Sequence, residues 1–156
     1  MTAAIIRIAK PEEASALSEL ALCSKRHWGY DADFLASCKE ELTYTSEQLS
    51  SPSYCFQVAE IPSQDIAGFF ALNFLDSEHP ELEALFIDPN FIGQGWGNKL
   101  LNSAISVAKT HKAKSIKLQG DPFAEGFYLA NGAVKVGETE SQSIPGRFLP
   151  LLEICL

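Results

Sequence analysis

Residues 82–108 read LEALFIDPNFIGQGWGNKLLNSAISVA, and this stretch decides how the rest of the chain is interpreted. Its first part, residues 83–87 (EALFI), is short and mostly apolar, as is typical of a strand. Residues 88–90 (DPN) break that strand and turn the chain. The run GQGWG then opens residues 98–108, whose apolar side chains recur at helical spacing: Leu100, Leu101, Ala104, Ile105 and Ala108. We therefore predict a strand, a glycine turn and a helix in direct succession.

A strand, a glycine-rich turn and a helix in this order favour anion binding. Glycines let the backbone approach a phosphate closely, and the first turn of a helix offers free N–H groups and the positive end of its dipole. The alternative is a tight turn that needs glycine only for its positive φ angles. The glycines alone therefore indicate a candidate phosphate site and nothing about the molecule that carries the phosphate.

Composition restricts the class of protein. With 156 residues, 46% hydrophobic and 21% charged, the chain is expected to form one globular domain over residues 1–156. We expect no membrane span, because no apolar run approaches about 20 residues, and no secretory signal in MTAAIIRIAKPEE. The net charge of −8 disfavours general nucleic-acid binding. The four cysteines are scattered without metal-ligand spacing, which predicts free thiols, no metal site and a cytoplasmic location.

The remaining elements follow from periodicity and from turn residues. We expect helices at residues 11–24, 32–42, 98–108 and 122–130. We expect strands at residues 3–8, 54–61, 66–75, 83–87, 114–118, 133–136 and 148–155. The order is β-α-α-β-β-β-α-β-α-β-β, in which residues 54–75 read as an antiparallel hairpin. This order predicts a mixed sheet with helices on both faces.

Two known phosphate motifs fit the glycine turn poorly. A Walker loop requires G-x-x-x-x-G-K-[ST], but Lys99 lies between Asn98 and Leu100, with no glycine before it and no hydroxyl after it. A dinucleotide fingerprint requires G-x-G-x-x-G, and Asn98 stands where its third glycine belongs. A nicotinamide-binding Rossmann domain is therefore disfavoured.

A different family fits better. The loop FIGQGWG (residues 91–97) resembles the acyl-CoA pyrophosphate loop of the GNAT superfamily of N-acetyltransferases, with the pattern [QR]-x-x-G-x-[GA]. Residues 121–133, DPFAEGFYLANGA, resemble that family's second motif, N-x-x-A-x-x-F-Y-x-x-x-G-[FA]. The order of elements matches as well, so the resemblance covers nearly the whole chain. It implies an α/β (α+β) fold with a mostly antiparallel sheet of six to seven strands, and acetyl-CoA as cosubstrate.

The resemblance also implies which residues contact the cofactor: Leu85, Phe86, Ile87, Ile92, Gly93, Gln94, Gly95, Trp96, Gly97, Asn98, Asp121, Ala124 and Phe127. Two of these depart from the family pattern. Ile92 replaces the usual Gln or Arg, which removes a side-chain contact but leaves the main-chain cradle. Asp121 replaces the commoner Asn, and an ionised carboxylate accepts hydrogen bonds without donating them. A contact between Asp121 and the pantetheine arm is therefore in question.

The implied reaction is direct acetyl transfer from acetyl-CoA to an amine, which requires a general acid and a base. By the resemblance, Tyr128 lies near the cofactor sulfur and protonates the leaving thiolate; the alternative is a packing role for its ring. Glu81 and Glu83 are expected on one strand face with Leu85 and Ile87, while Leu82, Ala84 and Phe86 share the other, unless a bulge intervenes. Glu83 is our candidate base, with Glu81 or a water chain as alternatives.

The acceptor site is less defined. His27, Trp28 and Tyr30 occupy the segment between the first two helices, which borders the acceptor in this family. Trp28 is equally suited to anchoring the core. The link at residues 138–147 is long enough to reach the same pocket, and Arg147 could pair with a substrate carboxylate.

Two hypotheses follow. The first is an N-acetyltransferase that moves the acetyl group of acetyl-CoA to a primary amine of a small molecule or peptide. The second is a non-catalytic acyl-CoA-binding domain that serves as a sensor or an assembly partner. A homodimer is possible in either case, because residues 148–155 (FLPLLEIC) are apolar enough to pair or to be buried.

Overall fold

The computed structural model describes residues 4–141 and 144–156. Its helical elements are η1 (Pro11–Glu13), α1 (Ala14–His27), α2 (Ala32–Cys38), α3 (Ser46–Ser50), η2 (Pro89–Phe91), α4 (Trp96–Thr110) and α5 (Glu125–Ala130). Its strands are β1 (Ile5–Ile8), β2 (Tyr54–Glu60), β3 (Ile66–Asn73), β4 (Glu81–Ile87), β5 (Ser115–Gln119), β6 (Val134–Glu140) and β7 (Phe148–Cys155). None of the described helices is long and apolar enough to cross a membrane.

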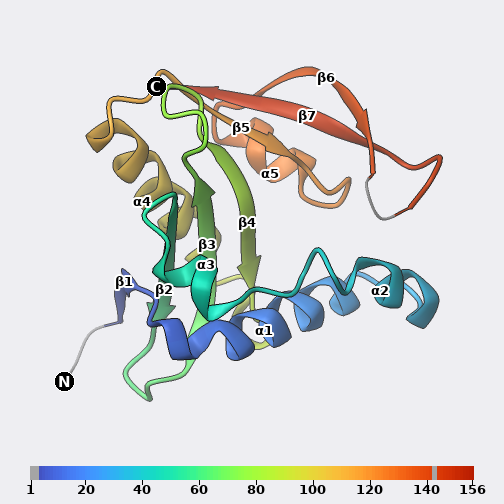
Figure 1. Cartoon of the computed structure of the whole chain (residues 1–156). Coiled ribbons are helices and arrows are strands. Elements are labelled where there is room, and N and C mark those ends of the chain that lie inside the picture. Colours follow the sequence, from blue (N-terminus) through green and yellow to red (C-terminus); the bar gives the residue numbers. More distant parts are fainter. Residues whose placement is uncertain (1–3, 142–143) are drawn as a thin grey trace.

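The strands form one sheet of seven in the order β1-β2-β3-β4-β5-β7-β6. All neighbours are antiparallel except β4 and β5, which are parallel and share a single register pair, Glu81 with Lys117. Beyond that pair the two strands diverge, so the sheet splits between its β1–β4 part and its β5–β7 part (Figure 1). This confirms the predicted mixed, mostly antiparallel sheet.

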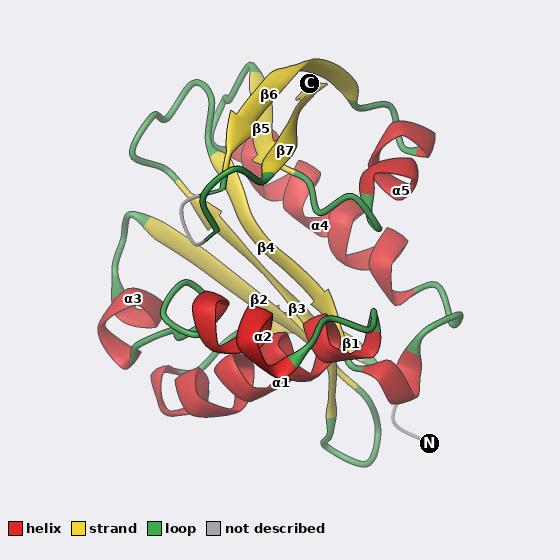
Figure 2. Ribbon diagram, turned by 90° about the vertical axis from the view of Figure 1, so that its right-hand side faces the viewer, coloured by secondary structure: helices red, strands yellow, loops and turns green. Residues whose placement is uncertain are grey.

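Helices cover both faces of the sheet, as predicted (Figure 2). One core lies under α4 and includes Phe70, Leu72, Leu100, Leu101 and Ile116. The second lies under α1 and includes Leu17, Val58, Phe69, Ala71 and Phe86. Alternate residues of β3 serve the two cores, because successive side chains of a strand point to opposite faces. The central strand β3 is therefore almost fully buried.

Most predicted elements are found with shifted ends. Asp31 caps α2 through a hydrogen bond from the Phe34 N–H, as expected, but α2 ends at Cys38 and not near residue 42. The first helix begins with a 3-10 turn at Pro11–Glu13, and α5 begins at Glu125. Strand β6 extends to Glu140, four residues beyond its predicted end, which shortens the link before β7. Residue 3 of the predicted first strand lies outside the described residues.

One prediction about β4 is wrong. Leu82 lies with Leu85 in the α4 core, whereas Ala84 lies on the α1 side, so simple alternation fails. The cause is a register shift opposite β3, where Ala71 pairs with Ala84 but Leu72 pairs with Leu82. Glu83 is the extra residue of this bulge, and a bulged residue is left outside the regular pairing.

Candidate functional site

A cavity of about 730 Å³ lies at the point where β4 and β5 diverge. All seven residues of β4 line it, together with the glycine turn, the start of α4, one face of α5 and the end of α1. Only Glu81 of β4 is paired with β5, so the β5-facing edge of residues 82–87 has no strand partner. Backbone N–H and C=O groups in such a position favour a ligand that hydrogen-bonds like a strand.

The glycine turn forms one end of the cavity. Gly93 and Gly95 have φ angles of 85° and 83°, a left-handed conformation that other residues adopt at a cost. Nothing lies within 4 Å of where a Cβ would stand at either position, so the backbone there faces open space. Gly95 is the N-cap of α4, a helix of 15 residues whose first N–H groups have no acceptor within the helix. The local geometry suits a phosphate.

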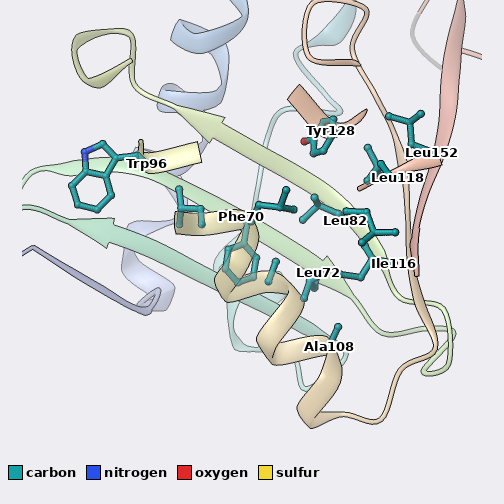
Figure 3. Close-up of a cluster of buried hydrophobic side chains, with 14 of the residues drawn as sticks. Phe70, Leu72, Leu82, Trp96, Ala108, Ile116, Leu118, Tyr128 and Leu152 are labelled. Atoms are coloured by element: carbon teal, nitrogen blue, oxygen red, sulfur yellow. The ribbon is translucent and has the colours of Figure 1, made fainter. Parts of the chain in front are cut away.

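Two further residues of this turn have packing roles. A Cβ on Gly97 would stand 3.3 Å from the Phe127 ring, so glycine allows α4 and α5 to approach closely. Trp96 is 7% exposed, and its Nε1–H is buried without an acceptor among the described residues. The Lys99 ammonium lies 4.6 Å from the centre of the Trp96 ring. Figure 3 shows Trp96 at one end of the α4 core and Tyr128 near the other.

Tyr128 projects from α5 into the same cavity and is 7% exposed. Its ring packs edge-on to Phe127, and Figure 3 places it beside Leu118 and Leu82. No described residue forms a hydrogen bond to the Tyr128 hydroxyl in this structure. Burial, and to a lesser extent the charge of Asp121, raises the pKa of Tyr128, so the phenol stays protonated at physiological pH. It is available to donate a proton to a group in the cavity.

Two carboxylates of β4 line the cavity. Glu83 is exposed and accepts a hydrogen bond of 2.8 Å from the Asn73 side chain. Glu81 is partly buried, and burial together with repulsion from Glu83 raises its pKa. A third carboxylate, Glu41, also lines the cavity, and Glu83 and Glu41 both act electrostatically on Tyr44. These carboxylates give one part of the cavity wall a negative charge.

A second group of charges surrounds Asp121. Its carboxylate accepts hydrogen bonds from Lys25 Nζ at 2.6 Å and from the Tyr30 hydroxyl at 3.0 Å. Arg147 Nη2 lies 3.6 Å from Asp121 and donates to the Tyr30 hydroxyl at 2.9 Å. Burial acts to raise the pKa of Asp121, but the hydrogen bond and charge of Lys25 outweigh it and lower the pKa. Burial, and then the negative charge of Asp121, raise the pKa of Tyr30 to about 12.

The structure brings most of the predicted site residues to this one cavity. The lining includes both candidate catalytic residues and all the candidate cofactor residues except Gln94, which is exposed. Trp28 and Arg147 also line it, and Trp28 stacks on Phe123 with ring centres 5.5 Å apart. His27 and Tyr30 do not line it: His27 is exposed, and Tyr30 contacts the lining residues Asp121 and Arg147. The roles of these residues remain predictions.

Several lining residues were not singled out from the sequence, among them Lys25, Glu41 and Tyr44. Each lies in a segment without a motif, and each reaches the cavity through tertiary packing. One weak signal existed: Lys25 begins the polar and aromatic run KRHWGYD, from which only the aromatic residues and His27 were chosen.

Comparison with known proteins agrees with this geometry. The model of the acetyltransferase (GNAT) family matches residues 16–133. The chain therefore belongs to the GNAT family of acetyltransferases. A search of curated protein sequences found no match.

Solved structures show the same fold. The PaiA N-acetyltransferase of Thermoplasma acidophilum, in complex with coenzyme A, has a TM-score of 0.78 at 19% identity, covering 99% of this chain and 100% of that one. A GCN5-related N-acetyltransferase of Rhodopseudomonas palustris has a TM-score of 0.80 at 19% identity, covering 100% and 98%. A spermidine N-acetyltransferase SpeG chimera from Vibrio cholerae and hSSAT has a TM-score of 0.73 at 18% identity, covering 99% and 96%. At these identities the likeness establishes the fold and not the substrate.

Proposed function

We propose that this protein transfers the acetyl group of acetyl-CoA directly to a primary amine of a small molecule or peptide. The observation that carries the proposal is the single cavity that joins the glycine turn, the unpaired edge of β4, Tyr128 and the β4 carboxylates. A binding domain without catalysis has no need of a buried phenol at the meeting point of these parts whose hydroxyl has no hydrogen-bond partner among the residues that the structure describes.

The cofactor end follows from the backbone. N–H groups of residues 93–98 would hold the pyrophosphate, and the unpaired edge of residues 82–87 would pair with the amide-containing pantetheine arm. A bound coenzyme A in the structurally similar PaiA N-acetyltransferase supports an acyl-CoA as cosubstrate.

The chemical step requires proton transfers at the amine and at the sulfur. Glu83 or Glu81 takes a proton from the acceptor ammonium, directly or through water, and leaves a neutral amine. The amine nitrogen then bonds to the acetyl carbon as the carbon–sulfur bond breaks, and Tyr128 donates its proton to the departing sulfur. The nitrogen of the new amide loses its remaining extra proton to the Tyr128 phenolate, directly or through water, which restores the phenol. A raised pKa suits both residues, because it keeps Tyr128 protonated and makes Glu81 a stronger base.

The acceptor is proposed to be cationic before it reacts. Glu41, Glu81 and Glu83 gather in one part of the wall, and an ammonium group is attracted to such a potential. Spermidine is the substrate named for a structural neighbour, and it is a sensible member of the first test panel.

Two measurements test the proposal. Saturating acetyl-CoA should raise the melting temperature of the protein, since a ligand that binds only the folded state stabilises it. The protein is then mixed at neutral pH with acetyl-CoA and a panel of primary amines that includes spermidine, peptides with a free N-terminus and amines that carry hydroxyl groups. At least one amine should increase the rate at which free coenzyme A thiol appears above the rate without amine. Stabilisation by acetyl-CoA without release for any amine would favour the sensor or assembly hypothesis. If acetyl-CoA does not raise the melting temperature, both the acetyltransferase hypothesis and the sensor or assembly hypothesis are rejected.

A further inference from the structure

Three polar side chains from three separate segments meet at the Asp121 carboxylate. Lys25 comes from the last part of α1, Tyr30 from the segment between α1 and α2, and Arg147 from the position just before β7. We call Asp121 and these three residues the Asp121 bridge. The hydrogen bonds among them span 91 to 117 positions of sequence and link the two parts of the split sheet, because α1 packs against the β1–β4 part.

The bridge is well sheltered. The Lys25 and Asp121 side chains are 14% and 17% exposed, and the two make a contact of 2.6 Å. The Arg147 guanidinium lies 4.8 Å from the Phe34 ring, and that ring stacks on Tyr30 with centres 4.0 Å apart. Separation of partly buried charges in such surroundings is costly, since each would lose its partner without regaining full hydration.

Asp121 also starts the segment that leads to the candidate acid. Its Oδ1 accepts a hydrogen bond from the Phe123 N–H at 2.9 Å. Its main-chain oxygen accepts from the N–H groups of Ala124 and Glu125, at the beginning of α5. Tyr128 lies on that short helix. One residue therefore fixes the entry to α5 and the segment between α1 and α2.

Both carboxylate oxygens of Asp121 are occupied by these contacts. An ionised carboxylate has nothing to donate to an amide oxygen of a cofactor. Three charged residues of the bridge line the cavity: Lys25, Asp121 and Arg147. Their charges are paired with one another, because Asp121 forms ion pairs with both Lys25 and Arg147.

We propose that Asp121 is a positioning residue that, through Lys25, Tyr30 and Arg147, holds the wall between α1–α2 and α5 closed around the amine acceptor, and that it is not a cofactor contact. The inference rests on the proposed function only in taking the bound molecule to be an amine acceptor. Loss of the bridge should loosen this wall and weaken acceptor binding while leaving acetyl-CoA binding intact.

Hydrogen exchange of the whole protein tests the bridge without any substrate. Tyr30→Phe removes the hydroxyl that joins Asp121 to Arg147, and Tyr30 does not line the cavity. Asp121→Asn removes the charge but keeps an oxygen for the Phe123 N–H. Lys114→Met, which breaks an exposed ion pair with Glu78, is the matched control. We expect exchange in residues 28–36 to quicken by about tenfold in the first two variants, as the loss of a charge-assisted hydrogen bond implies, and to be unchanged in the control.

Binding and kinetics separate positioning from a merely structural role. The dissociation constant of acetyl-CoA should change less than twofold in Tyr30→Phe and Asp121→Asn. For the amine of the panel that reacts fastest, the KM should rise about tenfold in both variants, while kcat changes far less. Lys25→Met should raise the KM for this amine in the same way, and Lys25→Arg should keep the wild-type KM.

Unchanged exchange in residues 28–36 would overturn the bridge. A tenfold loss of acetyl-CoA affinity in Asp121→Asn would make Asp121 a cofactor contact and overturn the assignment. If no amine turns over, the proposed function fails while the exchange result still decides the bridge.

Discussion

The two ends of the cavity are built in different ways. At the glycine end, where we propose that the cofactor binds, one continuous stretch lines the cavity with Gly93, Gly95 and the start of α4. At the acceptor end, where we propose that the amine binds, side chains arrive from α1, from β4 and from the segments before α5 and β7. A site made of the backbone of one continuous stretch can be recognised in the sequence as a short motif. A site made of side chains that are distant in sequence forms only when the chain folds, so no short motif indicates it.

The largest expected effect lies where the two ends meet. Tyr128→Phe should lower kcat by roughly 10²–10³-fold, because a positioned general acid contributes about that much. Acetyl-CoA affinity should change little, since the proposed cofactor contacts are mainly main-chain groups of residues 93–98 and 82–87, which this substitution leaves in place. Steady-state rates and a titration with acetyl-CoA measure the two quantities.

Tyr54→Phe is the matched control for that experiment. Tyr54 lies on β2 outside the cavity lining, and the loss of its hydroxyl should leave kcat unchanged. Turnover that survives in Tyr128→Phe would remove Tyr128 from the mechanism and assign its ring to packing.

The glycine end should respond to backbone strain. Gly95→Val places a β-branched residue at a φ of 83°, where an L-residue costs roughly 1–2 kcal/mol, so acetyl-CoA affinity should fall about tenfold. Gly132→Val is the control, because Gly132 also has a positive φ and open space around it but does not line the cavity. Calorimetric titration decides: equal losses in both variants would mean that strain anywhere, and not the cradle, weakens binding.

A smaller effect of opposite sign is expected beside the same turn. Ile92 lines the cavity and is 42% exposed, so Ile92→Arg adds a cation near the proposed pyrophosphate position without disturbing the core. Acetyl-CoA affinity should rise about twofold to fivefold at low salt, the range of exposed charge pairs, and the gain should shrink as salt is added. A salt-independent gain would contradict an electrostatic origin.

The smallest effect concerns stability at the acceptor end. Because burial and Glu83 raise the pKa of Glu81 in the folded chain, ionisation of Glu81 destabilises the fold, and this penalty is relieved as pH falls through that pKa. Glu81→Gln should therefore raise the melting temperature at pH 7 by ~1–2 °C, and the difference should vanish in acid. The exposed Glu78→Gln should show no such gain. A lower melting temperature in Glu81→Gln at pH 7 would contradict the claim that ionised Glu81 destabilises the fold.

The same contrast explains how far the sequence could be read. Strand, glycine turn and α4 were predicted correctly because each rests on local spacing and on conformations that only glycine adopts easily. The face of Leu82 was predicted wrongly because the bulge at Glu83 depends on pairing with β3, which periodicity does not contain. Lys25 was missed because nothing nearby in sequence shows that Asp121 lies 2.6 Å from it.

A crystal structure with bound acetyl-CoA tests the central claim most directly. The account predicts the pyrophosphate on the N–H groups of residues 93–98, the pantetheine arm along the unpaired edge of β4, and the thioester sulfur within hydrogen-bonding reach of the Tyr128 hydroxyl. The Asp121 carboxylate should keep its contacts to Lys25 and Tyr30 in that complex. A cofactor bound outside this cavity, or a thioester sulfur far from Tyr128, would contradict the account.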